Sequence, residues 1–388
     1  MSEDNNENNT PSPSTDPQPS APQPSDSQTS SSQQSPTEPV ENQAFRLVFS
    51  GEGAEYFRIW IVNLTLSILT LGIYSAWAKV RTNRYFYGST TLDGDAFEYH
   101  AEPLQILKGR IIAIAALAVY ILAQTFFPIV SLVLFGAFLL VLPLIVVRSL
   151  RFRAIMSSWR GIRFGFDGGV WDAAKAYVFW PLFGIVTLGF GMPYAWYKQN
   201  QYTVGNHRFG TTPAHSTTSG SDFYLIFFVI FGIAIVMSLG LGILGAIVAI
   251  AAGAGAGAEG AGSDNTGPAI AILAFIYIGY FFMYVLIFAV FQAMRYRLVY
   301  SNIVLSDTLT HSDVKVREWT KIVVINSVLL IITLGLYYPW ARVKLTNYMV
   351  TRTWIESPDL SGFMARTGQD ENALGEELGE AFDLGIGI

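Results

Sequence analysis

One uncharged stretch limits this chain more than any other feature, because Ile111 to Val147 contains no Asp, Glu, Lys or Arg. An apolar helix of roughly 20 residues crosses the hydrocarbon core of a bilayer, so the run is too long for one crossing. Polar residues and a proline interrupt it between Gln124 and Pro128. The sequence therefore predicts two membrane helices joined by a tight turn.

The rest of the chain contains more segments of this kind. Of the 388 residues, 51% are hydrophobic and only 14% are charged, which excludes an ordinary soluble domain. The candidate membrane segments are residues 57–77, 110–126, 129–147, 174–196, 223–250, 269–293 and 320–341. They lie within a predicted membrane domain, residues 45–358, and indicate a polytopic membrane protein.

Charge is distributed unevenly along the chain. Residues 1–44 contain seven acids and no base, whereas residues 359–388 contain seven acids and one Arg. The middle of the chain is therefore basic, with 23 bases against 15 acids. Basic residues beside membrane segments usually mark the cytoplasmic side and attract anionic head groups. We expect the lipid bilayer as the partner, with anionic head groups at these residues, and no nucleic acid.

Both ends of the chain are predicted to be tails. Residues 1–42 are rich in Pro, Ser, Gln and Asn, a composition typical of disorder. Their first residues lack the basic and apolar regions of a signal peptide. Residues 359–388 form the predicted acidic C-terminal tail. Neither tail contains a motif that identifies its partner, and a homo-oligomer is compatible with the sequence.

A repeated motif indicates internal duplication. TLGIYSAWAKVRTNRY, from Thr70, returns as TLGLYYPWARVKLTNY from Thr333, and a looser copy, TLGFGMPYAWYKQNQY, begins at Thr187. Alignment of residues 55–85 with residues 318–348 pairs 31 positions, of which 13 are identical. We infer that one structural unit occurs three times, with the middle copy the least regular.

Short polar segments separate these units. They begin at Gly88, Ser157, Gly205 and Ser301, and they alternate apolar and polar residues around Gly or Asp. Such alternation predicts short strands or hairpins. The predicted fold class is an all-α polytopic membrane protein. It is an internally repeated helical bundle with short β-like cytoplasmic cap elements and a disordered N-terminal tail.

The motifs resemble those of a known family. RFRAIMSSWRGIRFGFDG, the recurring TLG-x-Y-x-x-W-A-[KR]-V and the C-terminal ALGEELGEAFDLGIGI are similar to those of the YjgN family, bacterial inner-membrane proteins of unknown function. The resemblance covers roughly residues 45–388. It implies a multi-pass protein of the bacterial inner membrane, and it provides no activity, cofactor or catalytic residue.

Each copy of the repeat opens with an acid that precedes a base by three residues. The pairs are Glu55 with Arg58, Asp172 with Lys175, and Glu318 with Lys321. On a helix the two side chains of each pair lie on one face. One interpretation is a helix start whose base extends towards the head groups. The other is a gate or an ion pathway, since ionisable groups in lipid are costly and often functional.

Asn63 and Asn326 occupy matched positions deeper in the first and last copies. An amide in an apolar environment needs a hydrogen-bond partner, which a neighbouring helix can provide. Facing copies would let the two amides bond to each other. Helix packing and contact with a substrate are the two interpretations.

The end of each copy has the composition of an interfacial anchor. Gly72 and Gly335 precede aromatic clusters, where the helix is expected to bend or stop. Trp and basic residues prefer the membrane interface. The predicted anchors are Trp77, Trp340, Trp196, Lys79, Arg81, Arg342 and Lys344. A broken helix can also build a transport site.

The sequence contains no recognisable catalytic, cofactor or metal motif. It has no Cys, and its four His lack metal-ligand spacing. We therefore expect no enzyme, no cofactor and no metal. A transporter or channel is the first functional hypothesis, because of the duplication and the intramembrane polar residues. A scaffold or envelope-maintenance protein that binds anionic lipid or proteins is the alternative, and a lipid-modifying enzyme is the third class.

Topology separates the first two hypotheses. If all seven segments span, the second half of the chain is inverted and its basic loops lie outside, against the usual distribution of basic residues. If the three repeated units re-enter or lie at the interface, every basic loop and both tails stay cytoplasmic. Re-entrant backbone must then be shielded by protein.

Overall fold

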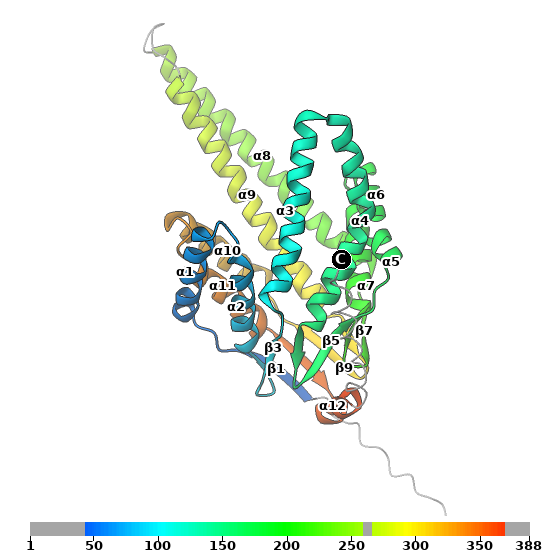
Figure 1. Cartoon of the computed structure of the whole chain (residues 1–388). Coiled ribbons are helices and arrows are strands. Elements are labelled where there is room, and N and C mark those ends of the chain that lie inside the picture. Colours follow the sequence, from blue (N-terminus) through cyan, green and yellow to red (C-terminus); the bar gives the residue numbers. More distant parts are fainter. Residues whose placement is uncertain (1–42, 259–265, 369–388) are drawn as a thin grey trace, which may run out of the picture. The chain divides into compact units, whose positions relative to one another are not determined.

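The computed structural model describes residues 43–258 and 266–368, so the predicted tail of residues 1–42 lies outside the described part. The expectation of an all-α fold is wrong. Ten short strands in this part of the chain form a closed antiparallel barrel, in the order β1-β10-β9-β8-β7-β6-β5-β4-β3-β2. Strands of three to seven residues are not stable alone, and closure pairs every edge. The segments expected as separate caps therefore combine into one barrel (Figure 1).

The strands are distributed along the whole described chain. They are β1 (Gln43–Phe49), β2 (Thr90–Leu92), β3 (Asp95–Tyr99), β4 (Ser157–Trp159), β5 (Ile162–Phe166), β6 (His207–Phe209), β7 (Thr212–Ser216), β8 (Ile303–Leu305), β9 (Thr308–Ser312) and β10 (Thr353–Ser357). Asp93 and Gly94 between β2 and β3, and Arg160 and Gly161 between β4 and β5, have positive φ, as a two-residue hairpin turn requires.

Helical hairpins connect the other neighbouring strands. Their helices are α1 (Gly53–Leu69) with α2 (Ser75–Gly88), α3 (Pro103–Phe126) with α4 (Pro128–Ile155), α5 (Val170–Ala174), η1 (Lys175–Phe179) and α6 (Trp180–Val186) with α7 (Met192–Gly205), α8 (Gly220–Ala258) with α9 (Thr266–Tyr300), and α10 (Val316–Ile332) with α11 (Tyr338–Thr351). The three copies of the repeat are the first, third and fifth of these hairpins.

Strand register places all the helical hairpins at one end of the barrel. The last strand residue before the first hairpin, Phe49, pairs with the first strand residue after it, Thr90. The same is true of Tyr99 with Ser157. The remaining pairs are Phe166 with His207, Ser216 with Ile303, and Ser312 with Thr353. The β-turns, the start of β1 and the end of β10 therefore lie at the opposite end.

Two of the hairpins contain helices of membrane-spanning length. The candidate spans are Pro103–Phe126, Pro128–Ile155, Gly220–Val248 and Leu273–Tyr300, and most residues of their apolar windows are not buried within the protein. The other apolar segments, residues 57–77, 174–196 and 320–341, each contain a turn between two helices. A single straight helix does not form there, because each TLG motif reverses the chain.

The barrel interior is packed and apolar. Trp159 and Phe209 are buried in this core, and α12 (Leu360–Gly368) packs Leu360 and Phe363 against them. A Cβ on Gly210 would lie 2.7 Å from Thr367 Cγ2, so α12 lies directly against the β6–β7 turn. This helix belongs to the segment predicted as an acidic tail, of which residues 369–388 lie outside the described chain.

Candidate functional site

The TLG motif forms the same tight turn in all three copies. In the first copy, the Leu71 N–H donates to Ile68 O at 3.1 Å and the Gly72 N–H donates to Ser67 O at 2.7 Å. This is the Schellman pattern that ends many helices. The Thr70 hydroxyl also accepts a hydrogen bond from the Tyr74 N–H at 2.9 Å. The motif therefore ends one helix and starts the next.

Leucine occupies an unusual backbone position in these turns. Leu71, Leu188 and Leu334 have φ of 50°, 54° and 49°, where glycine is normally found. Their exposed fractions are 95%, 90% and 93%. The left-handed conformation costs an L-residue about 1–2 kcal/mol, and full exposure of Leu to water would add to that cost. Each of the three tips therefore presents an exposed leucine side chain.

A tyrosine joins the two helices at the base of each short hairpin. The Tyr85 hydroxyl donates to Glu52 O at 2.9 Å, and Glu55 Oε2 lies 3.2 Å from the same hydroxyl as an alternative acceptor. Tyr348 donates to Glu318 Oε2 at 3.0 Å, and Tyr202 donates to Gly169 O at 3.0 Å. Desolvation raises the pKa of Tyr85 to about 12 and that of Tyr202 to about 12. We call these three tyrosines the hairpin clasps.

The clasps account for two of the three acids of the predicted acid-base pairs. Glu55 and Glu318 face clasp tyrosines on the partner helix of their own hairpin, and Arg352 also contacts Glu318 at 3.1 Å. Lys175 Nζ lies 3.0 Å from Asp172 Oδ1, so the middle copy forms the expected pair. Among the described residues, no ion pair includes the bases of the other two pairs, Arg58 and Lys321.

The two predicted amides are buried, but they do not bond to each other. Asn326, 3% exposed, donates to Ala341 O of α11 at 3.5 Å, so it lies inside its own hairpin. Asn63, 4% exposed, has no hydrogen-bond partner for either side-chain atom. An unpaired buried amide is unfavourable. This arrangement gives the two amides no shared site.

The first and last hairpins pack against each other, since β1 and β10 are neighbours in the barrel. Phe57 stacks on Trp340 with ring centroids 4.9 Å apart, and Trp60 contacts Tyr338 at 6.0 Å. A Cβ on Gly53 would lie 2.4 Å from Trp340 Cδ1. Trp340 thus belongs to a helix contact, which we call the aromatic seam.

The other predicted anchors have separate surroundings. Trp77 stacks on Tyr74 with centroids 6.1 Å apart, and Trp196 contacts Phe291 of α9 at 5.0 Å. Lys344 donates to the Tyr337 hydroxyl at 2.6 Å, and Arg81 is exposed. The structure therefore does not collect the predicted anchor residues into one site.

Two of them do join a larger cluster. Lys79 and Arg342 lie with Arg110 of α3 and Arg153 of α4, a group that we call the basic cluster. Partial desolvation lowers the pKa of Lys79, and the charges of Arg153, Arg110 and Arg342 lower it further. Sequence reasoning missed Arg110 and Arg153 as site residues, although Arg110 is the last charge before the long apolar run.

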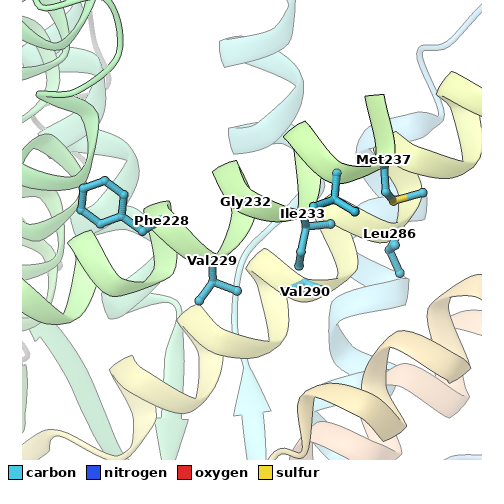
Figure 2. Close-up of a pocket in the computed structure, with 8 residues that line it drawn as sticks. Phe228, Val229, Gly232, Ile233, Met237, Leu286 and Val290 are labelled. Carbon is cyan, nitrogen blue, oxygen red and sulfur yellow. The ribbon is translucent and has the colours of Figure 1, made fainter. Parts of the chain in front are cut away.

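An apolar groove lies between α8 and α9. Figure 2 shows Phe228, Val229, Ile233 and Met237 on one side and residues of α9 on the other. The groove is shallow and open, has a volume of about 470 Å³ and is lined by apolar residues, so it suits hydrocarbon better than a polar solute. In residues 43–258 and 266–368, no three His, Asp or Glu side chains gather as metal ligands.

Comparison with known proteins identifies the family. The model of a family described as bacterial protein of unknown function (DUF898) matches residues 44–381. The inner membrane protein YjgN of Salmonella typhimurium is 37% identical over 131 residues, which cover 33% of this chain and 32% of that protein. YjgN of Escherichia coli is 33% identical over 128 residues, 32% of each chain. No solved structure matches.

The aligned segment spans about a third of the length of these relatives. The family model, in contrast, covers nearly all of the described residues. Both comparisons agree with the repeated motifs and with helices long and apolar enough to cross a membrane. The chain is therefore a membrane protein of the DUF898 family of bacterial proteins of unknown function, the YjgN family that its motifs resemble.

Proposed function

We propose that this protein is a multi-pass protein of the bacterial inner membrane that binds anionic lipid at the cytoplasmic leaflet and acts as a scaffold. In this proposal α3, α4, α8 and α9 span the bilayer. The three short hairpins insert only their leucine tips, and the barrel lies in the cytoplasm. Anionic head groups meet the basic residues near the barrel end of the helices.

One observation carries the proposal: every helical hairpin leaves the barrel and returns to it at the same end. The helix ends beside the barrel contain many of the basic residues, including Lys108, Arg148 and Arg295. With the barrel in the cytoplasm, these residues satisfy the positive-inside rule without exception for any hairpin. The exposed apolar tips then lie in the same leaflet as the head groups that the bases attract.

The same observation weighs against the transporter or channel hypothesis. In an inverted-repeat transporter, the chain crosses the membrane an odd number of times before the second half begins, so the second half is inverted. Here the middle repeat is a hairpin that begins and ends beside paired strands, which gives the second half no inversion. Asn63 and Asn326 lie within separate hairpins and do not share a site.

Single-cysteine labelling tests this proposal, and the chain contains no native Cys. Phe127→Cys lies at the α3–α4 turn, and Thr211→Cys lies at the β6–β7 turn, at opposite ends of the protein. In spheroplasts, we expect an impermeant thiol reagent to label the first variant and to reach the second only after lysis. Label on Thr211→Cys in intact spheroplasts would contradict the proposed topology.

A functional assay separates the scaffold from the transporter. We expect proteoliposomes to show the same ion and solute flux as empty liposomes, and phosphatidylglycerol to bind more tightly than phosphatidylcholine. Flux that requires the protein and disappears in a folded Asn63→Ala variant would instead support a transporter. Equal binding of the two lipids would refute the lipid-binding proposal.

A further inference from the structure

The basic cluster is organised around one face of α2. Ser75, Lys79 and Phe86 are separated by one and two helical turns, so they lie on the same side of the helix. Arg110 Nη1 of α3 donates to the Ser75 hydroxyl. The Arg342 guanidinium of α11 lies 4.7 Å from the centre of the Phe86 ring. Two arginines from other helices are thus held on either side of Lys79.

Arg153 completes the group from the end of α4. Phe152, the residue before Arg153, packs in one apolar cluster with Val80 and Tyr87 of α2, and the charge of Arg153 helps to lower the pKa of Lys79. The four cations therefore come from four different helices, which belong to the first, second and last hairpins. Helix packing, and not neighbouring positions in the sequence, brings them together.

The basic cluster has no acidic counterpart. Within residues 43–258 and 266–368, the ion pairs involve Arg160, Lys175, Arg208, Lys315, Arg352 and two His, but no member of the cluster. Besides desolvation, three positive side chains lower the pKa of Lys79, and no carboxylate acts on it in the opposite direction. Like charges held together are unfavourable, and a bound anion removes that cost.

The internal repeat explains the two central cations. Lys79 and Arg342 occupy the same position in their copies, in WAKV and WARV. The aromatic seam brings these two copies together, so both basic residues reach one place. The middle copy has Trp196 at this position, packed on Phe291 of α9. Only the two copies that meet at the seam retain a base there.

We propose that Lys79, Arg110, Arg153 and Arg342 form a binding site for the phosphate group of an anionic phospholipid. This site rests on the proposed lipid-binding function and gives it a location. Lys79 lies about two turns, roughly 10 Å, from the leucine tip of its hairpin. If the tip is among the acyl chains, Lys79 is therefore at the level of the head groups. Arginine offers five N–H donors in a geometry that suits phosphate.

Native mass spectrometry of the full-length protein with phosphatidylglycerol tests the site. Lys79→Gln with Arg342→Gln removes the two central cations. Arg317→Gln with Lys321→Gln is the matched control, since it removes two exposed cations from α10 of the last hairpin. We expect the first double variant to weaken phosphatidylglycerol binding at least about tenfold and the control to stay within about twofold of the wild type. An equal loss in both double variants, or no loss in the first, would overturn the assignment.

Two further arms keep the result interpretable. The cluster variant loses like-charge repulsion but also the contacts of Arg342 with Phe86 and the Tyr338 hydroxyl, so its thermal unfolding temperature should stay close to that of the wild type. Weaker binding with near-normal unfolding then reports the site itself. If that variant does not fold, Arg110→Gln with Arg153→Gln replaces it, with the same expected loss of phosphatidylglycerol binding.

The second control uses inorganic phosphate without lipid. Saturable phosphate binding that displaces phosphatidylglycerol would overturn the lipid assignment. Failure of the wild type to prefer phosphatidylglycerol over phosphatidylcholine would instead refute the proposed function.

Discussion

The three hairpin tips place an exposed leucine in a left-handed backbone conformation, at Leu71, Leu188 and Leu334. Glycine would adopt their left-handed backbone without strain, yet all three copies have leucine followed by glycine. A soluble protein gains nothing from an exposed Leu in a strained position, whereas a membrane tip gains apolar surface in lipid. The following glycines carry the more extreme backbone, with φ between 91° and 94°.

The glycine of the turn can be tested alone. Gly72→Ala should lower the free energy of unfolding by about 1 kcal/mol or more, because alanine disfavours φ of +91° while its Cβ would meet no atom within 4 Å. Gly109→Ala is the control, since Gly109 is helical and equally unobstructed. Denaturation in the same detergent should show a small increase in the free energy of unfolding for the control. Equal effects in both variants would contradict the role of backbone strain.

At the scale of the element, the short hairpins differ from the long ones in how their helices are joined. Each short hairpin has a Schellman turn at its tip and a clasp tyrosine at its base. The α3–α4 hairpin instead turns at Phe127 and Pro128, and helix lengths there suit the bilayer thickness. A short hairpin is therefore a closed unit, and its helices of 17 and 14 residues in the first copy are shorter than the 24 and 28 residues of α3 and α4.

The clasp makes stability depend on alkaline pH. Tyr85 has its pKa raised from 10.0 to about 12 in the folded protein. Its contribution to stability is therefore complete below pH about 10 and is lost as the pH rises towards 12, because the unfolded chain releases the proton first. Tyr85→Phe should lower the unfolding free energy by about 1 kcal/mol at pH 8. Because Phe does not ionise, the variant should also show a smaller decrease in unfolding free energy between pH 10 and 12 than the wild type.

Chemical denaturation in detergent across this pH range measures the effect. Tyr284→Phe is the control, since this residue is exposed on α9. It should follow the wild type at every pH. An alkaline loss in Tyr85→Phe as large as that of the wild type would show that the clasp does not contribute.

At the scale of the whole molecule, barrel closure determines which hairpins are neighbours. The pairing of β1 with β10 places the first and last copies of the repeat side by side, although more than 200 residues separate them. The aromatic seam and the basic cluster both depend on this contact. Opening the barrel between β1 and β10 would separate Lys79 from Arg342.

A designed disulfide tests that closure. Ala44 of β1 pairs with Glu356 of β10, and Leu309 of β9 pairs with Glu356 on the other side of β10. Ala44→Cys with Glu356→Cys should crosslink under mild oxidation, because directly paired strand residues lie within disulfide distance. Ala44→Cys with Leu309→Cys should not, since β10 lies between them. A mobility shift in denaturing gels measures the crosslink, and its absence in the first pair would contradict a closed barrel.

Much of the organisation was predictable from local patterns. The uncharged run from Ile111 to Val147 predicted a hairpin, and the structure has α3 and α4 with a break at Phe127. Alternation in the polar segments predicted short strands, and the TLG motif predicted a helix break. These features depend on residues close together in the sequence, so periodicity and turn chemistry report them.

The sequence by itself determined that this chain belongs in a membrane, where its helices break and which unit is repeated, because composition and local backbone preference suffice for each. Only the tertiary structure decided that the strands close into a barrel, that Trp340 packs on Phe57, and that Lys79 meets Arg110, Arg153 and Arg342. The physical reason is that strand pairing joins segments far apart in the chain. Short strands show which residues can pair, but the choice of partner depends on packing of the complete molecule.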